Sequence, residues 1–239
     1  MESKITLYFS EKLTPGMTSN LTESQSHYIK NVMRIKKGER ISLFNSENGE
    51  WSAVILNHGK ILSEFKVEKL FKKKNTEKNI WLAFSPIKKI PQDFMLQKTT
   101  ELGIQRFIPI KFDRSITRDV NIDRAKKIVI EASEQSNRIS IPKIFEVINL
   151  KNFLNNFPEN GQLIFCDINC KKNNFNKINF DTGPICVIIG PEGDFTENER
   201  NLILQHKKTI SISLASNILR AETAAIVATS ILSYNSNKT

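Results

Sequence analysis

Short apolar runs separated by turn residues make up most of the first part of the chain. The segments ITLYF, RISLFN, EWSAVILN and ILSEFKVEKLF are rich in Ile, Val and Phe, as strands are. Gly38 and the pairs Asn48-Gly49 and His58-Gly59 supply turn signals between them. One helix-like segment, ESQSHYIKNVM, interrupts the series. We therefore predict a small β-barrel domain over residues 1–71.

The hydrophobic pattern changes after residues 72–79. That segment, KKKNTEKN, holds no apolar residue and is predicted to be a linker. From residue 80 to residue 239, short apolar runs alternate with segments of helical periodicity. Strands are expected at 81–84, 107–110, 163–168, 185–190 and 209–214, and helices at 91–102, 122–137, 196–206 and 218–234. This alternation predicts an α/β domain with a mostly parallel sheet, whose ligands bind beyond the carboxyl ends of the strands.

One candidate site is the segment VIIGPEGDFTENE, in which an apolar run leads into a glycine-containing turn. Thr196 and Glu199 have the spacing of a capping box, which starts the next helix. The segment lacks the lysine of a P-loop and the spacing of a dinucleotide fingerprint. Glu192 and Asp194 disfavour phosphate and suit a neutral or cationic ligand. A plain strand-to-helix turn remains the alternative.

A second candidate site is the segment SLASNILRAETAAIVATSIL. Its alanines recur on one face of a helix, which permits close packing against a neighbour. Arg220 falls in the first turn of that helix, where a cation opposes the helix dipole. Two explanations stay open: Arg220 pairs with a carboxylate such as Glu192 or Glu222, or it awaits an anionic ligand.

The charge balance favours a polyanionic partner. The formal net charge is +10 and the pI is about 9.5, which points to nucleic acid ahead of a membrane surface. Because lysine dominates the basic residues, a compositional bias would give the same charge. Arginines are more informative, and Arg114, Arg118 and Arg138 are candidate phosphate contacts.

The cysteines and the amino terminus bear on the compartment. The three cysteines form no CxxC pair and lie far in sequence from the histidines, so we expect no metal site. An odd number of cysteines and the lack of a signal-like amino terminus suit a cytoplasmic protein without a membrane span.

Four segments together resemble a known family. QKTTELG, EASEQSNRISIPKI, IIGPEGDFTENE and LASNILRAETAA resemble motifs of the bacterial 16S ribosomal RNA uridine-N3 methyltransferases, members of the SPOUT superfamily. The resemblance spans about residues 20 to 234. It implies a PUA-like barrel followed by a SPOUT domain with a carboxyl-terminal trefoil knot. It also implies S-adenosylmethionine as cofactor, 16S ribosomal RNA in the small subunit as partner, and a homodimer.

The resemblance also implies roles for individual residues. Arg220 and Glu222 are the candidate catalytic residues. Arg34, Lys36 and Lys37 of the barrel join the three arginines above as RNA contacts. We expect three strand-end loops to form the cofactor pocket, one of them after LIFCDI. The assigned cofactor contacts are Ile189, Gly190, Glu192, Gly193, Leu214, Ala215, Asn217, Ile218 and Leu219.

Two departures from the family pattern stand out. This chain has Gly193-Asp194 where the family often has Gly-Gly before Phe. It has Leu214-Ala215-Ser216-Asn217 where the family often has Leu-Gly-x-Arg, which weakens any role for position 217. Two alternative functions remain: the same chemistry on another RNA base or ribose, and RNA binding without catalysis.

Overall fold

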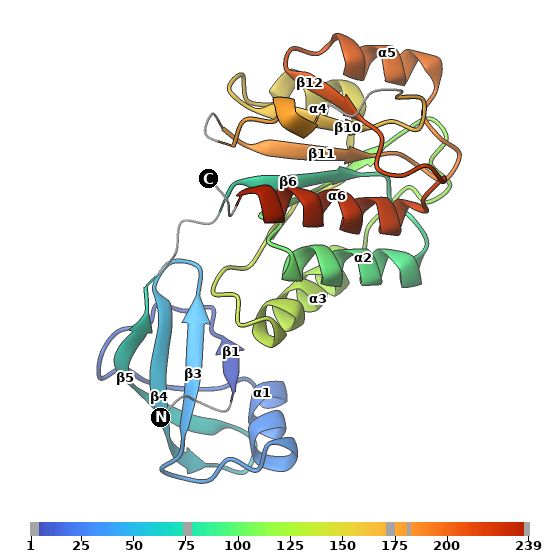
Figure 1. Cartoon of the computed structure of the whole chain (residues 1–239). Helices are drawn as coiled ribbons and strands as arrows, with labels where there is room; N and C mark the ends of the chain where they lie inside the picture. Colours follow the sequence, from blue (N-terminus) through green and yellow to red (C-terminus); the bar gives the residue numbers. More distant parts are fainter. Residues whose placement is uncertain (1–4, 74–77, 171–174, 181–182, 237–239) are drawn as a thin grey trace. The chain divides into compact units, whose positions relative to one another are not determined.

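The chain folds into two compact units. The computed structural model describes residues 5–73, 78–170, 175–180 and 183–236 (Figure 1). One unit holds the described residues up to Lys73 together with Ser133–Ile141, and the other holds the rest. The predicted linker includes residues 74–77, which lie outside the described residues. Residues 133–141 join the first unit through contacts with segments that are distant in sequence. The local hydrophobic pattern does not encode such contacts.

The first unit is built on a five-stranded sheet in the order β1-β3-β4-β5-β2. The four expected strand segments are present as β1 (Thr6–Tyr8), β3 (Arg40–Asn45), β4 (Gly49–His58) and β5 (Ser63–Lys72). The sequence did not indicate β2 (Thr18–Asn20), which is short and polar. β1 pairs with β3 in parallel, and the other pairs are antiparallel.

The helix of the first unit has two parts. α1 (Glu23–His27) begins with a capping box between Thr22 and Gln25. It continues directly into the π-helical turn η1 (Tyr28–Val32). The buried side chain of Ile29 packs into the core of the unit, together with Leu43, Ile55 and Phe65 of the sheet.

The second unit contains a parallel sheet in the order β12-β10-β11-β6-β7-β8. Its strands are β6 (Ile80–Phe84), β7 (Arg106–Lys111), β8 (Lys143–Ile144), β10 (Gln162–Cys166), β11 (Ile185–Ile189) and β12 (Thr209–Ile212), and β9 (Ile148–Asn149) also pairs with β7. The predicted parallel sheet is confirmed. β11 lies between β10 and β6, so the spatial order departs from the chain order. Because all of these strands are parallel, the loops that follow their carboxyl ends lie along one edge of the sheet.

Helices cover both faces of this sheet. α2 (Lys89–Glu101) and α6 (Ala221–Ser236) lie side by side on one face, as Figure 1 shows, while α3 (Ile122–Gln135) follows β7 in the chain. α4 (Leu150–Asn156) and α5 (Glu197–Gln205) pack on the opposite face. Ala225 and Ala228 of α6 are fully buried, so the predicted alanine face is a packing surface. None of the helices described is long and apolar enough to cross a bilayer.

Candidate functional site

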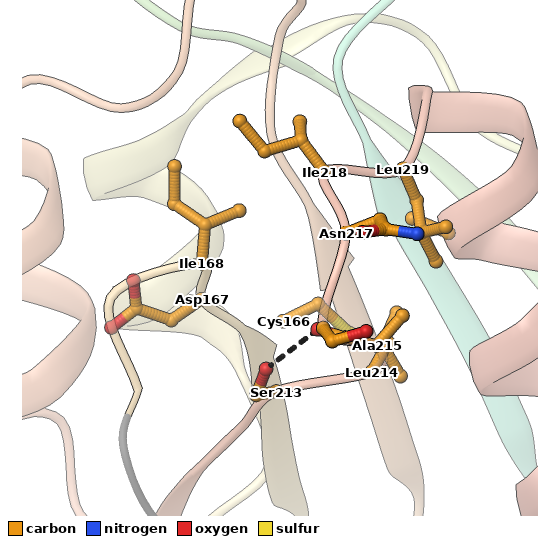
Figure 2. Close-up of a pocket in the computed structure, with 11 residues that line it drawn as sticks. Cys166, Asp167, Ile168, Ser213, Leu214, Ala215, Asn217, Ile218 and Leu219 are labelled. Atoms are coloured by element: carbon orange, nitrogen blue, oxygen red, sulfur yellow. Dashed lines mark hydrogen bonds between the residues drawn. The ribbon is translucent and has the colours of Figure 1, made fainter.

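A pocket opens where β10 and β12 end (Figure 2). Its volume is about 100 Å³, and eleven residues line it. Five of them are predicted cofactor contacts: Leu214, Ala215, Asn217, Ile218 and Leu219. The other six are Cys166, Asp167, Ile168, Ser213, Ser216 and Ala224. Two of the three expected strand-end loops thus meet at one cavity.

Asp167 holds the loop after β10 in place. Its side chain is 3% exposed, and its Oδ2 atom accepts hydrogen bonds from Arg200 Nη2 at 2.5 Å and Nε at 3.1 Å. Its Oδ1 atom accepts from the backbone N–H of Asn169 at 2.9 Å. In Figure 2 the Asp167 carboxylate turns away from the Ser213–Leu219 segment. Asp167 therefore supports one wall of the pocket through its pairing with α5.

The opposite wall is largely backbone and apolar side chains. Ser213 Oγ donates to the carbonyl of Ala215 at 3.3 Å, which tightens the turn after β12. Ile218 is 82% exposed and Ile168 is 56% exposed, and both line the cavity. Such exposed apolar groups are available to cover a flat apolar ligand. No lysine or arginine is among the lining residues.

The glycine turn after β11 lies outside this lining. Ile189, Gly190, Glu192 and Gly193 were predicted to contact the cofactor, and none of them lines the cavity. A Cβ atom at Gly190 would lie 2.5 Å from the ring of Phe195, a residue that is 8% exposed. The absence of a side chain at Gly190 therefore lets Phe195 pack beneath the turn.

Asp194 takes a conformation that usually favours glycine. Its φ angle is +60°, and its Oδ1 atom accepts a hydrogen bond from the Phe195 N–H at 2.8 Å. Aspartate tolerates this left-handed region better than most residues because its short side chain bonds locally. Asp194 thus preserves the backbone conformation that a second glycine provides.

The loop after β7 braces the same turn. Arg114 Nη1 donates to the carbonyl oxygens of Gly193 at 3.1 Å and Phe195 at 3.4 Å. The buried carboxylate of Glu199 accepts from the Asp113 N–H at 2.8 Å and from the Thr196 N–H at 2.9 Å. The predicted capping box of α5 is present, and it also joins two strand-end loops.

The two candidate catalytic residues lie at the start of α6. Arg220 is exposed, Glu222 is half-buried, and the Arg220 carbonyl accepts the first helical hydrogen bond from Ala224. Within the described ranges, no ion pair joins Arg220 to Glu192 or Glu222. The guanidinium of Arg220 is thus available at the edge that carries the pocket.

The predicted RNA contacts differ in exposure. Arg34, Lys36, Lys37 and Arg118 are exposed, as phosphate contacts require. Arg114 is exposed but bonded to the glycine turn. Arg138 is only 8% exposed, and its Nε donates to Ser140 Oγ at 2.8 Å. Its burial favours an internal structural role, because a phosphate contact requires an accessible guanidinium.

Some pocket residues were not assigned from the sequence. The loop after LIFCDI was expected to contribute, yet Cys166, Asp167 and Ile168 were not named. The sequence signal for this part of the pocket is Asp167, a single carboxylate at the end of the apolar segment LIFCDI. Burial raises the pKa of the Cys166 thiol, so this side chain is a neutral wall. No cluster of three potential metal ligands occurs in the part of the chain that the structure describes.

Family comparisons agree with this architecture. The family model described as an RNA methyltransferase domain matches residues 74–233, and the model of an RNA methyltransferase PUA domain matches residues 21–68. The ribosomal RNA small subunit methyltransferase E of Rickettsia conorii is 36% identical over 226 residues, which cover 93% of this chain and 92% of that protein. The protein of the same name from Bacillus subtilis is 26% identical and covers 94% of this chain and 93% of its own.

A solved structure shows the same fold. It is the ribosomal RNA small subunit methyltransferase E of Neisseria gonorrhoeae, crystallised with S-adenosylmethionine bound. It is 29% identical to this chain, covers 97% of each chain, and superposes with a TM-score of 0.88.

Proposed function

Because this chain belongs to the family of ribosomal RNA small subunit methyltransferases E, we propose that it methylates N3 of a specific uridine in 16S ribosomal RNA. It is an S-adenosylmethionine-dependent ribosomal RNA methyltransferase. The observation that carries the assignment is the pocket at the ends of β10 and β12, lined by the segment that resembles the family motif LASNILRAETAA.

The pocket residues fit the cofactor chemically. S-adenosylmethionine supplies an activated methyl group on a cationic sulfonium. No basic side chain lines the cavity, so none repels that cation. Ile168 and Ile218 offer exposed apolar surface for an adenine ring, and the Ser213–Leu219 backbone offers hydrogen-bonding groups. Ile189, Gly190, Glu192 and Gly193 complete the proposed site from the third strand-end loop.

A pocket of about 100 Å³ is smaller than most ligand sites, which span roughly 300–1,000 Å³. The cofactor therefore extends beyond this cavity, or the exposed Ala215–Ile218 segment moves to admit it. The Asp167–Arg200 pair and the Arg114 hydrogen bonds fix the loops that flank this segment.

The proton on uracil N3 has to leave for a methyl group to be accepted. Glu222, half-buried in the first turn of α6, is the proposed proton acceptor. Removing that proton places negative charge on the uracil oxygens. Arg220 is the proposed donor that stabilises this charge, as preorganised cations do in polar active sites. Because N3 is paired in a duplex, the target base must be unpaired when it enters.

RNA binding is proposed to use exposed cations of both units. Arg34, Lys36 and Lys37 follow η1 in the first unit, and Arg118 lies in the loop after β7. The net charge of +10 adds a general attraction for phosphates. The trefoil knot and the homodimer that the resemblance implies are also part of this proposal.

Methyl incorporation tests the proposal. Purified protein is incubated with labelled S-adenosylmethionine and small ribosomal subunits from a strain that lacks the corresponding methylation. The RNA is then digested to nucleosides and separated. We expect the label in 3-methyluridine of 16S RNA. Label in another base, in ribose or in transfer RNA would contradict the N3 assignment.

A further inference from the structure

A second pocket opens at the same edge of the sheet, beside the ends of β6 and β7. Its volume is about 390 Å³. The residues that line it come from the loops after these two strands and from the amino-terminal parts of α2 and α3. Because all strands of this sheet run in parallel, these loops share an edge with the pocket at β10 and β12. None of the residues proposed above for catalysis or cofactor binding lines it.

The floor of this pocket combines apolar surface with one polar group. Ile87 and Leu96 are 4% and 1% exposed and provide the apolar part. Gln92 is 8% exposed, and its Oε1 atom accepts from the Ile87 N–H at 3.2 Å. That bond fixes the amide orientation, because only the oxygen can accept. The Gln92 Nε2 group has no hydrogen-bond partner among the described residues, and it is not enclosed by protein, so it is a donor open to a ligand in the pocket.

The charged groups that line this pocket differ in whether they are already paired. Asp93 is neutralised by Arg124, whose Nη2 and Nε atoms lie 2.5 and 3.0 Å from Asp93 Oδ2. Lys89, in contrast, is exposed and forms no ion pair with any described residue. It belongs to the first turn of α2, which has no acidic residue. An anionic group is favoured at this place by both the lysine and the helix dipole.

Asp119 and Thr117 stand on the side of the loop after β7. The carboxylate of Asp119 disfavours phosphate there but accepts hydrogen bonds from amino groups and hydroxyls. The pocket is therefore divided: an anion suits the Lys89 side, and a flat group with donors and acceptors suits the interior. A volume of about 390 Å³ lies within the usual range for ligand sites.

We propose that this second pocket binds an unpaired nucleotide of the RNA substrate that flanks the methylated uridine, with its base in the interior beside Gln92 and its phosphate at Lys89. This inference rests on the proposed function and adds a recognition site to it. Holding a neighbouring nucleotide supplies binding energy away from the reacting base and fixes the strand across the edge. Gln92 is then a specificity residue that reads an acceptor on the base.

Three substitutions with the same change of charge test this site. Lys89→Ala and Gln92→Glu alter the pocket, and Gln92→Glu keeps the acceptor for the Ile87 N–H while it removes the donor. Lys88→Ala is the matched control, because Lys88 is exposed and does not line the pocket. We expect Lys89→Ala and Gln92→Glu to raise KM for small subunits about fivefold, as losing one hydrogen bond of about 1 kcal/mol does. The kcat value and S-adenosylmethionine affinity should stay within about twofold.

Equal KM values for all three variants would contradict nucleotide binding in the second pocket. Methylation by the wild type would still support the proposed function in that case. Absence of activity in the wild type would instead overturn the proposed function. A direct measurement follows the Gln92 side-chain amide by NMR during titration with nucleoside 5′-monophosphates. A shift with nucleotides, absent with inorganic phosphate, is expected. An equal response to phosphate alone would show an adventitious ion site and contradict nucleotide recognition.

Discussion

Arg114 donates a hydrogen bond of 3.1 Å to the carbonyl oxygen of Gly193, which joins the loop after β7 to the glycine turn after β11. Sequence reasoning assigned Arg114 to RNA, yet its guanidinium is already engaged with the turn. A second bond from the same nitrogen to Phe195 strengthens this link. The arginine therefore positions the turn that we propose as part of the cofactor site.

Arg114→Ala should weaken S-adenosylmethionine binding about fivefold, because the turn loses a bond of about 1 kcal/mol. Isothermal titration calorimetry measures the dissociation constant. Arg118→Ala removes an equal charge from the same loop and is the control, with binding expected within about twofold. An unchanged dissociation constant for Arg114→Ala would separate the turn from cofactor binding.

Asp194 should be replaceable by glycine but not by a branched residue. Its φ of +60° costs little for glycine and roughly 1–3 kcal/mol for valine. Asp194→Gly loses the bond to the Phe195 N–H but relaxes the backbone, so its free energy of unfolding should lie within about 1 kcal/mol of wild type. Asp194→Val should be less stable than Asp194→Gly in urea unfolding. The reverse order would show that the left-handed conformation does not decide this position.

Arg220→Ala should lower methylation at least about 100-fold, the size typical of losing one key transition-state donor. Glu222→Gln should also lower it, since the amide cannot accept the proton. Both side chains are partly or fully exposed, so unfolding midpoints should match the wild type. Near-normal methyl incorporation by Arg220→Ala, measured with saturating RNA, would remove its catalytic assignment.

The thiol of Cys186 should resist alkylation, because this residue is 0% exposed in the core of the sheet. Burial raises the pKa of its thiol above the usual range. Only the thiolate reacts with iodoacetamide, so labelling at pH 8 should be far slower than for N-acetylcysteine. In the unfolded state the thiol has its ordinary pKa of about 8.5. As pH rises, the unfolded state therefore loses this proton before the folded state does, and the free energy of unfolding falls above that pH. Rapid labelling of Cys186 in the folded protein, detected by peptide mass spectrometry, would contradict its burial.

The sequence predicts local elements well and their pairing poorly. The strands β6, β10 and β11 can be predicted from their apolar runs, because buried parallel strands have few polar residues. Their spatial order depends on crossovers between distant segments, which no local pattern encodes. α4 has only seven residues, too few for a clear helical period.

The candidate site shows the same division. The polar corner Leu214–Leu219 was assigned from its motif and lines the pocket. Arg114 and Arg138 were both assigned to RNA from residue type alone. Their partners are set by tertiary contacts, with Arg114 bonded to Gly193 and Arg138 buried beside Ser140. Residue type identifies a cation, and only the fold decides whether it is free to bind RNA.

Reverse transcription of treated 16S RNA tests the central claim most directly. A methyl group on N3 blocks Watson–Crick pairing, so the copying enzyme stops at the modified uridine. Small subunits that lack the methylation are incubated with S-adenosylmethionine and either the wild-type protein or Arg220→Ala. We predict one new stop at a single uridine with the wild type and a much weaker stop with the variant. Full-length copies after wild-type treatment, despite methyl incorporation into the RNA, would contradict methylation at N3.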